Sequence, residues 1–440
     1  MTRVLHQSDP DFSRSFEALL VREHDDLSAV DATVAEIIAT VRREGDAALV
    51  RFTREFDRHE IAVAGLRFSE ADIASLAARC DAEIREALTF AAERIRRYHQ
   101  ALLPVDLDYV DEVGVRLGAR WRPVDSAGIY VPGGTAAYPS SVLMNAIPAC
   151  VAGVTRIAMT VPTPDGLANP AVFAAAQIAG VSEIYGIGGA QAIAALAFGT
   201  ETIRPVDKIV GPGNIYVAAA KKSVFGRVGI DTIAGPSEIT IVADATNNPD
   251  WMAADLLSQA EHDVNAQAIL ITDDVSFAAA VGDAVERLLK GMTRADIART
   301  SWERNGAIVI SRDRAGAVEL VNRIAPEHLE LAVENPSDMA AEIRHAGAIF
   351  LGRWTPETLG DYVGGPNHVL PTSGAARFSS GLGVHDFLKR TSILECGPNS
   401  FAALAMPAIV LAHSEGLEGH ARAAALRLRH HNDGPGRDVG

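Results

Sequence analysis

Short apolar segments alternate with alanine-rich segments along most of this 440-residue chain, and this alternation limits the possible folds more than any other feature. In a first series, the strand candidates are 156–161, 183–187 and 208–211, and the helix candidates are 170–179, 190–198 and 215–224. A second series of strand candidates covers 237–244, 266–272, 307–311 and 348–352. Strands that alternate with helices form parallel sheets covered by helices. The sequence therefore predicts an α/β protein with two mostly parallel, helix-flanked, incomplete Rossmann-like sheets.

Segments rich in glycine and proline at 132–139 and 233–237 separate the two series and indicate a domain organisation. We expect 129–236 to be a nucleotide-binding-like domain, inserted into a main α/β domain that is formed by 24–128 and 237–381. Small helical extensions, 1–23 and 382–440, would flank these domains. Helical spacing of apolar residues over 71–98, with Ser69 and Asp72 at its start, also predicts a long helix near the amino terminus.

Composition and charge argue against several classes of function. The chain has 56 acidic and 40 basic residues and a formal charge of -16, so neither a nucleic acid nor an anionic membrane is an expected partner. Its cysteines, Cys80, Cys150 and Cys396, lack the CxxC spacing of a zinc site and fit a reducing compartment. The amino terminus does not resemble a secretory signal, and the apolar run 401–412 is shorter than the roughly 18–20 residues of a membrane span. We therefore expect a cytoplasmic protein.

Three glycine-rich segments, 131–141, 186–196 and 211–214, each follow a predicted strand and lead towards a helix. Ligands of parallel sheets bind where loops leave the carboxyl ends of the strands, and free N–H groups at a helix start favour phosphate. Gln191, however, stands where the dinucleotide fingerprint has its third glycine. Tight turns between strand and helix are also glycine-rich for steric reasons, so the loops alone leave both interpretations open.

Two further segments carry groups that could bind a metal or move protons. Gln259 and His262 are three residues apart at the end of a predicted helix, where they are either metal ligands on one face or an ordinary helix end. Glu327 and His328 are adjacent proton-transfer groups between strand-like segments. Neighbours in a strand point to opposite faces, so this pair needs a turn to act together. A surface pair is the alternative.

Polar residues also gather in two segments nearer the carboxyl terminus. Asp361 and His368 lie in the long Gly-, Pro- and Ser-rich stretch 359–383, which is too apolar for a free linker. Glu415 and His420 follow an apolar run and could equally belong to a capped carboxy-terminal helix. The GxSxG, P-loop and HExxH patterns are absent from the sequence, so three common hydrolase or NTPase classes lack their signatures.

Taken in order, these segments resemble the histidinol dehydrogenase family over about residues 20–430. The segments that carry the resemblance are VPGG…YPSS, GPGN, AGPSE, SQAEH, NRIAPEHLEL, AGAIFLG, LGDY…GPNHVLPT and EGLEGH. The resemblance implies an NAD-linked, four-electron oxidation of L-histidinol to L-histidine through bound histidinal, in the last steps of histidine biosynthesis. It also implies a homodimer with intertwined domains and shared active sites.

The resemblance further implies roles for individual residues. One zinc ion per subunit would be bound by Gln259, His262, Asp361 and, across the dimer, His420 of the partner subunit. The acid–base pair would be Glu327 and His328. Substrate contacts would be Ser237, Gln259, His262, His328, Asp361, His368, Glu415 and His420. NAD contacts would be Tyr130, Gln191 and Asn214.

Other interpretations stay open from the sequence. A related branch of the family oxidises sulfonated diols, although the segment DYVGGPNHVLPT is more similar to the histidinol branch. Without the resemblance, the residues would also suit a zinc hydrolase or a two-lobed binding protein for a small molecule. Zinc and manganese both accept nitrogen and oxygen ligands, so the ligand types alone do not fix the metal.

Overall fold

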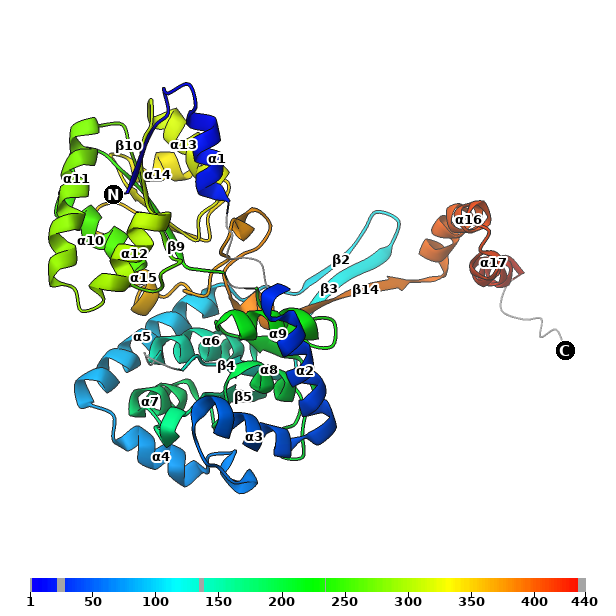
Figure 1. The fold of residues 1–440 in the computed structure, drawn as a ribbon. Coiled ribbons are helices and arrows are strands. Elements are labelled where there is room, and N and C mark those ends of the chain that lie inside the picture. The colour runs from blue at the N-terminus through cyan, green and yellow to red at the C-terminus, as the bar shows by residue number, and fades with distance from the viewer. Residues whose placement is uncertain (1, 22–27, 134–137, 234, 434–440) are drawn as a thin grey trace. The chain divides into compact units, whose positions relative to one another are not determined.

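The computed structural model describes residues 2–21, 28–133, 138–233 and 235–433. Residues 134–137 of the first glycine-rich segment and the tail from residue 434 lie outside this range. The chain forms two compact units (Figure 1). The larger unit consists of Met1–Leu102 and Val124–Phe387, and the smaller unit consists of Leu103–Pro123 and Leu388–Gly440.

The larger unit contains a six-stranded sheet in which all neighbouring strands are parallel, in the order β1-β11-β10-β9-β12-β13. All residues of β9, β10, β11 and β12 are buried. A strand covered on both faces can be apolar at every position, which explains uninterrupted runs such as QAILIT. The strands are β1 (Arg3–His6), β9 (Glu238–Ala243), β10 (Gln267–Thr272), β11 (Ala307–Ile310), β12 (His328–Ala332) and β13 (Ala348–Leu351).

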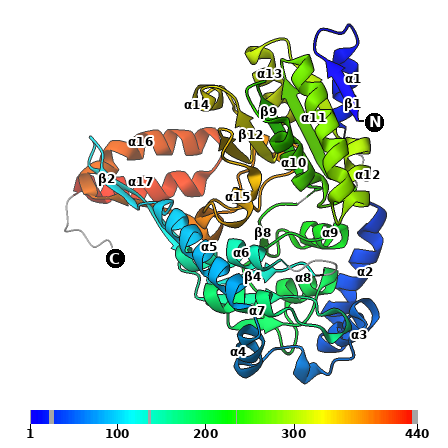
Figure 2. The ribbon, with the colours of Figure 1, turned by 90° about the vertical axis from the view of Figure 1, so that its left-hand side faces the viewer.

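Helices cover both faces of this sheet (Figures 1 and 2). On one face lie α10 (Pro249–Ala260), α11 (Val275–Leu288) and α12 (Ala295–Asn305). On the other face lie α1 (Phe12–Leu20), α13 (Arg314–Ile324) and α14 (Pro336–Ala340). The short helix α15 (Glu357–Tyr362) follows β13 and contacts α10. Each face therefore has its own apolar core.

The larger unit also contains a five-stranded parallel sheet in the order β6-β5-β4-β7-β8. Its strands are β4 (Ser126–Tyr130), β5 (Arg156–Thr160), β6 (Glu183–Tyr185), β7 (Lys208–Val210) and β8 (Gly229–Ile230). Its helices are α6 (Pro139–Ala152), α7 (Pro170–Ala179), α8 (Gly189–Phe198) and α9 (Ile215–Val224). A helix that is apolar on all sides has to be buried, and residues 190–197 of α8 are buried.

Four earlier helices pack around this second sheet. They are α2 (Ser28–Glu44), α3 (Asp46–Asp57), α4 (Glu70–Ala78) and α5 (Ala82–Ala101). Helix α2 contacts α8 and α9, and its apolar face belongs to their core. Helices α4 and α5 contact α7, and α5 also contacts α6.

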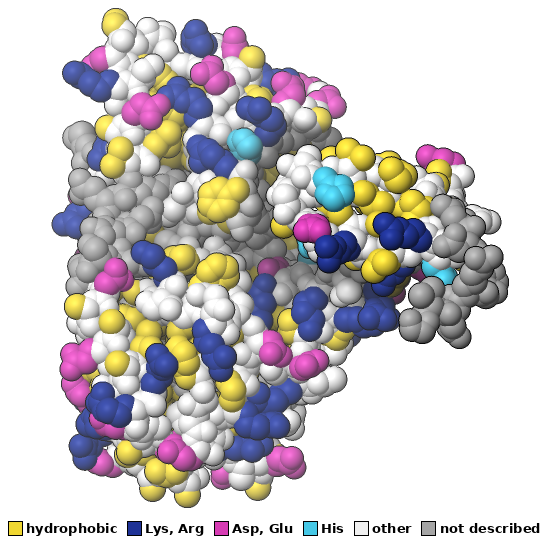
Figure 3. All heavy atoms as spheres, turned by 90° about the vertical axis from the view of Figure 1, so that its right-hand side faces the viewer, with side chains coloured by type: hydrophobic (Ala, Val, Ile, Leu, Met, Phe, Trp, Pro, Cys, Tyr) yellow, Lys and Arg dark blue, Asp and Glu magenta, His cyan; other side chains and the backbone are white. Residues whose placement is uncertain are grey.

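The smaller unit is an antiparallel sheet followed by two helices. Strand β3 (Val115–Pro123) lies between β2 (Leu107–Val110) and β14 (Leu388–Cys396). Helices α16 (Pro398–Ser414) and α17 (Glu418–Asp433) pack against each other. Many of its apolar side chains are exposed, and Figure 3 shows them on the surface as yellow spheres. The exposed residues include Leu107, Val110, Leu394, Met406, Val410 and Leu411.

The predicted α/β class with two parallel, helix-flanked sheets is confirmed. The predicted start of a helix at Ser69 is also confirmed, because Ser69 and Asp72 form a reciprocal capping box. The single long helix over 71–98 is wrong: α4 ends at Ala78 and Asp81 caps a new helix, α5. Within the described residues, no helix is both long and apolar enough to cross a membrane. The domain boundaries at 129, 236 and 382 stay predictions.

Candidate active site

The backbone of Glu238, the first residue of β9, holds both members of the predicted acid–base pair. Its N–H donates to Glu327 Oε2 at 2.8 Å, and its carbonyl oxygen lies 3.0 Å from His328 Nδ1. Glu327 precedes β12 directly after a turn in which Ala325 has a φ of 52°. This turn brings two sequence neighbours together at the amino end of β12. The sequence-based requirement for a turn is thereby met.

The contact with Glu238 also fixes the proton of His328. A carbonyl oxygen only accepts, so Nδ1 carries a hydrogen and the lone pair of the neutral ring is on Nε2. Among the described residues, Nε2 has no hydrogen-bond partner, and Asp361 Oδ1 lies 3.6 Å away. His328 therefore presents a base at a defined atom of a buried ring.

Three carboxylates surround His328. Glu327 Oε2 and Glu357 Oε1 are each 3.6 Å from its Nδ1, and Asp361 lies on the Nε2 side. Burial lowers the pKa of His328, but Glu357, Glu327 and then Asp361 outweigh burial and raise this pKa to about 10. A divalent cation bound at Asp361 would offset these negative charges and lower the pKa of His328 towards the range that a general base needs.

The predicted metal ligands of the larger unit come from two helices. Gln259 is in the last turn of α10, where it is 1% exposed, and His262 follows α10 with an exposed side chain. Asp361 is on α15 and is partly buried. Burial raises the pKa of Asp361, but the adjacent His328 and the charges of the other nearby imidazoles lower it below its usual value. The partial negative charge of the carboxyl end of α10 also favours a cation.

Glu357 is a site residue that was not singled out from the sequence. It is 2% exposed and lies four residues before Asp361 on α15, so both side chains share one helix face. Burial raises the pKa of Glu357 to about 8, and the neighbouring His328 opposes this rise. His328, Glu357 and Asp361 have ligand atoms within 4.8 Å of one another. In the sequence, only the four-residue spacing between Glu357 and Asp361 could have indicated that Glu357 belongs to the site.

His368 is fixed at both ring nitrogens. Nδ1 donates to the carbonyl oxygen of Asp361 at 2.9 Å, and Nε2 lies 3.3 Å from Ser141 Oγ in the first turn of α6. Arg94 of α5 donates to the carbonyl oxygens of residues 363 and 364. The stretch 359–383, which the sequence marked as functional, is thus tied to the rest of the larger unit around Asp361 and His368.

The remaining predicted substrate contacts are Ser237, Glu415 and His420. Ser237 directly precedes β9 and is half-buried beside Glu238. Glu415, which caps α16, and His420 on α17 belong to the smaller unit, where both side chains are exposed. The structure therefore brings together Gln259, His262, Glu327, His328, Asp361 and His368. The predicted roles of Glu415 and His420 as site residues stay predictions.

The three predicted NAD contacts line one cavity of about 1060 Å³. Tyr130 ends β4, and its hydroxyl oxygen accepts the N–H of Gly189 at the start of α8 at 3.1 Å. Gln191 is 1% exposed, and its Oε1 has no hydrogen-bond partner among the described residues. Asn214 caps α9 by accepting from Tyr216 and Val217. A cavity of this size beside two helix starts fits a dinucleotide, and a bound ligand would satisfy Gln191.

The GPGN segment shows why its loop needs glycine. Gly211 has a φ of 118°, and a Cβ there would collide with the carbonyl oxygen of Tyr130. Lys221 and Asp231 form a buried ion pair next to this loop. Lys221 donates to the carbonyl oxygen of Gly211, and Asp231 accepts the Gly211 N–H. The steric interpretation and the binding interpretation of this loop are therefore compatible.

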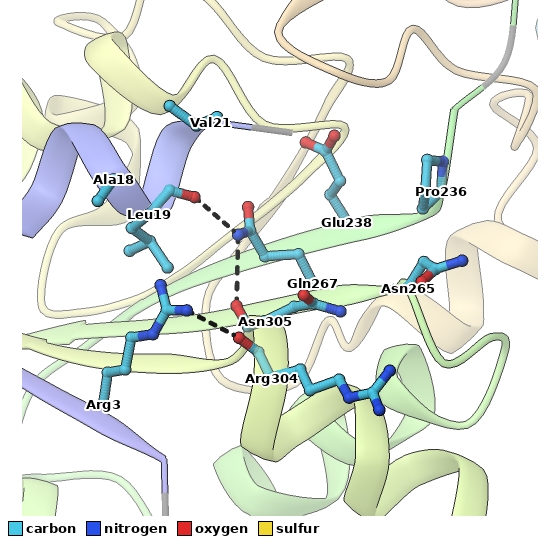
Figure 4. Close-up of a pocket in the computed structure, with 10 residues that line it drawn as sticks. All are labelled: Arg3, Ala18, Leu19, Val21, Pro236, Glu238, Asn265, Gln267, Arg304 and Asn305. Atoms are coloured by element: carbon cyan, nitrogen blue, oxygen red, sulfur yellow. Dashed lines mark hydrogen bonds between the residues drawn. The ribbon is translucent and has the colours of Figure 1, made fainter. Parts of the chain in front are cut away.

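A smaller cavity of about 210 Å³ adjoins the amino ends of β9 and β10 (Figure 4). Glu238 lines it, while Gln267 donates to the carbonyl oxygens of Leu19 and Asn305 across its floor. The side chain of Glu238 also accepts the N–H of Ser373 at 2.6 Å. These contacts fix the strand end that holds Glu327 and His328.

A dinucleotide-sized cavity and a separate histidine–carboxylate cluster are the combination expected of a metal-dependent dehydrogenase. The donor types of Gln259, His262 and Asp361 fit zinc and leave room for a further ligand and a substrate.

Comparison with known proteins agrees with this class. The family model described as histidinol dehydrogenase matches residues 20–428. The chain is 57% identical to the histidinol dehydrogenase of Rhodospirillum rubrum over 425 residues, covering 96% of this chain and 98% of that protein. It is 58% identical to that of Ruegeria pomeroyi, covering 97% and 99%. The crystal structure of histidinol dehydrogenase from Elizabethkingia anophelis has a TM-score of 0.92 and 35% identity, covering 97% of this chain and 98% of that one.

The chain therefore belongs to the histidinol dehydrogenase family. Its activity is the oxidation of histidinol in histidine biosynthesis, and the family's enzymes use NAD and zinc. The family assignment made from the sequence is confirmed.

Proposed function

We propose that the amino ends of β9 and β12 form the centre that converts L-histidinol to L-histidine, through histidinal that stays bound. One zinc ion per subunit would be held by Gln259, His262, Asp361 and the partner subunit's His420. The observation that carries this proposal is the cluster around Asp361, whose Oδ1 lies 3.6 Å from Nε2 of the buried His328 ring and whose pKa is lowered by the nearby His262. Gln259 reaches the same cluster through its contact with Glu357. When bound, the zinc ion holds the nitrogen groups of the substrate and polarises them.

His328 takes the proton of the substrate alcohol in the first half-reaction. The hydrogen bond from Nδ1 to Glu238 leaves Nε2 as the accepting atom, and this atom faces the Asp361 side of the cluster. Positioning by a backbone carbonyl keeps the ring from rotating, so the base is held where the alcohol would be bound. The cavity lined by Tyr130, Gln191 and Asn214 would hold NAD⁺, which would supply the acceptor for each of the two hydrides.

Glu327 activates water in the second half-reaction, when the aldehyde is hydrated. Its Oε2 accepts the N–H of Glu238. Glu327 and His328 are each less than a tenth exposed, so bulk water is excluded around the pair. A buried carboxylate that is fixed by a backbone N–H can take the proton of a single water that is aimed at the aldehyde carbon.

The other predicted contacts orient the substrate and the cofactor. His368 lies beside Asp361, and Ser237 lies next to Glu238, so both suit the polar ends of an amino alcohol. Glu415 and His420, which belong to the smaller unit, would be further substrate contacts. In the dinucleotide-sized cavity, Tyr130, Gln191 and Asn214 would contact NAD.

A homodimer with shared sites is part of the proposal. The smaller unit has four apolar side chains that are each more than half exposed, which is costly for a surface that stays in water: Leu394, Met406, Val410 and Leu411. Packing these apolar side chains against a second copy would bury them and could deliver the partner's His420 to the zinc ion. We also place the enzyme in the cytoplasm, because its cysteines, Cys80, Cys150 and Cys396, are all free.

Two measurements test this proposal. Purified protein with histidinol and NAD⁺ should show the absorbance of reduced nicotinamide and should contain one zinc ion per subunit; a sulfonated diol as the better substrate would reassign it to the related branch. Mixed dimers of the inactive variants His420→Ala and His328→Asn should recover part of the activity, because one of their two sites is intact. No recovery in verified mixed dimers would contradict site sharing.

A further inference from the structure

Glu357 is within hydrogen-bond distance of the side chain of Gln259. The side-chain amide of Gln259 satisfies its surroundings in one orientation only, in which its nitrogen donates to Glu357 Oε1 at 2.7 Å and to Oε2 at 3.2 Å. A divalent cation bound beside Glu357 would keep its carboxyl group ionised, against the rise in pKa that burial causes. In the opposite orientation, the amide oxygen would then face two carboxylate oxygens, with no hydrogen between the acceptors. The carboxylate of Glu357 therefore dictates which end of the amide points away from it.

The direction of this amide matters because the two ends of glutamine differ as metal ligands. The oxygen can bind a divalent cation, whereas the NH₂ group carries no available lone pair and its hydrogens repel a cation. An uncharged amide is also a weak ligand. Donation to a carboxylate draws electron density towards the amide oxygen, as a carboxylate behind a histidine raises the basicity of a ligating imidazole.

Glu357 itself is held firmly enough to act in this way. Its backbone N–H donates to Glu330 Oε1 at 2.6 Å, and its side chain is 2% exposed. It opens α15, the same short helix that carries Asp361. One helix therefore supplies one proposed ligand and the group that orients another.

We propose that Glu357 is a positioning residue that turns the amide oxygen of Gln259 towards the metal and strengthens it as a ligand. The inference rests on the proposed function, because it needs Gln259 to be a zinc ligand. It differs from direct ligation by Glu357: a positioning residue acts only while Gln259 is present, and a direct ligand acts without it.

The test is a double-mutant cycle on zinc affinity, measured by competition between the metal-free dimer and a chelator, with zinc alone as the probe. The variants are Glu357→Gln, Gln259→Ala and the combination of both. We expect E357Q to weaken zinc binding about 10–100-fold when Gln259 is present and less than about two-fold when residue 259 is alanine. Equal losses in both backgrounds, or no loss when Gln259 is present, would overturn the proposal.

A second readout reports the ligand directly. Cobalt(II) can replace zinc, and its visible absorption depends on the donor atoms. E357Q should shift the visible bands of the cobalt enzyme in the same direction as Q259A, whereas unchanged bands would contradict the proposal. Glu330→Gln is the matched control, because it makes the same isosteric change at a carboxyl that contacts the backbone of Glu357 but not Gln259. The cobalt bands of E330Q should equal those of the unaltered enzyme.

Two further outcomes are distinguishable. If Q259A leaves zinc affinity unchanged, the ligand set of the proposed function is wrong, and this inference falls with it. If Q259A weakens zinc binding and E357Q does not, only the role of Glu357 is wrong. Should E357Q fail to fold, Glu357→Asp retains the charge at a greater distance from Gln259. E357D should then weaken zinc binding to a smaller degree, and an unchanged affinity would refute the role.

Discussion

The two parallel sheets of the larger unit carry their proposed site residues at opposite ends. In the five-stranded sheet, Tyr130 ends β4, and Gln191 and Asn214 lie at the starts of helices that follow β6 and β7. In the six-stranded sheet, Glu238 and His328 begin their strands, and Gln259 lies at the end of a helix. The proposed NAD contacts thus follow the expectation that ligands gather at the carboxyl ends of strands, whereas the proposed metal centre departs from it.

The difference follows from the charge of the proposed ligands. Helix starts offer free N–H groups and partial positive charge, which suit the phosphates of a dinucleotide. The end of α10 offers partial negative charge beside Asp361, which suits a metal ion. The first N–H of a strand is also free to hold a carboxylate, as the N–H of Glu238 holds Glu327. We therefore expect the metal ion at the amino ends of the six-stranded sheet and the phosphates of NAD at the carboxyl ends of the five-stranded sheet.

The largest expected effect is on the amino ends of the six-stranded sheet. Removing zinc with a chelator should abolish turnover, and added zinc should restore it, because three of the proposed ligands belong to this region. The circular dichroism of the larger unit should persist, since both of its sheets have complete apolar cores. Full turnover without any zinc detectable by metal analysis would show that the amino ends of the six-stranded sheet do not hold a catalytic zinc ion.

The next effect separates the two half-reactions. Glu327→Gln should slow the oxidation of added histidinal by about 10²–10⁴-fold, the usual contribution of a general base, and slow alcohol oxidation much less. The amide can still accept the N–H of Glu238, so the fold should persist. Single-turnover rates with histidinol and histidinal measure the two steps. Equal losses in both would refute the role of Glu327 as the water activator.

A smaller effect is expected at the carboxyl ends of the five-stranded sheet. Tyr130→Phe removes the acceptor of the Gly189 N–H and one polar group from the dinucleotide-sized cavity. One hydrogen bond is worth about 1 kcal/mol, so NAD⁺ should bind about five-fold more weakly. Calorimetric titration measures this change. Zinc affinity should not change, and a parallel loss of zinc would mean that the two regions are not independent.

The last effect concerns the free energy of unfolding and comes from one buried histidine of the larger unit. His99 of α5 is 1% exposed without hydrogen-bond partners among the described residues, and burial lowers its pKa to about 4. The unfolded chain, with a pKa near 6.5, takes up this proton first as the pH falls. The free energy of unfolding should therefore fall by about 2–3 kcal/mol between pH 6.5 and 4 on account of His99.

His99→Phe removes this titrating group while keeping an aromatic ring. Urea denaturation at pH 7 and pH 4.5 should show a smaller loss of stability on acidification for H99F than for the unaltered chain. An identical loss in both would show that His99 is already paired or solvated.

The sequence predicted the buried parts of the fold best. Runs such as QAILIT identify strands because burial on both faces leaves only apolar residues. Strand β1 was not predicted, because RVLH is short and half-exposed at the edge of its sheet. The end of α4 was missed because apolar spacing continues across it, and the stop depends on the cap at Asp81.

The site was predicted residue by residue only through the resemblance to a family. Spacing could place Gln259 with His262, but it could not bring them to Asp361, which comes from another helix. Glu357 was missed because its significance lies in a contact with Gln259 that joins distant parts of the chain. Strand alternation also does not say which end of a sheet holds the chemistry.

Anomalous X-ray diffraction at the zinc edge of the dimeric enzyme would locate the metal itself. We expect one peak per subunit, about 2.0–2.2 Å from Gln259 Oε1, a ring nitrogen of His262 and a carboxylate oxygen of Asp361, with His420 of the partner subunit as the fourth ligand. A peak at the carboxyl ends of the six-stranded sheet, or one that Gln259, His262 and Asp361 do not share, would contradict this expectation.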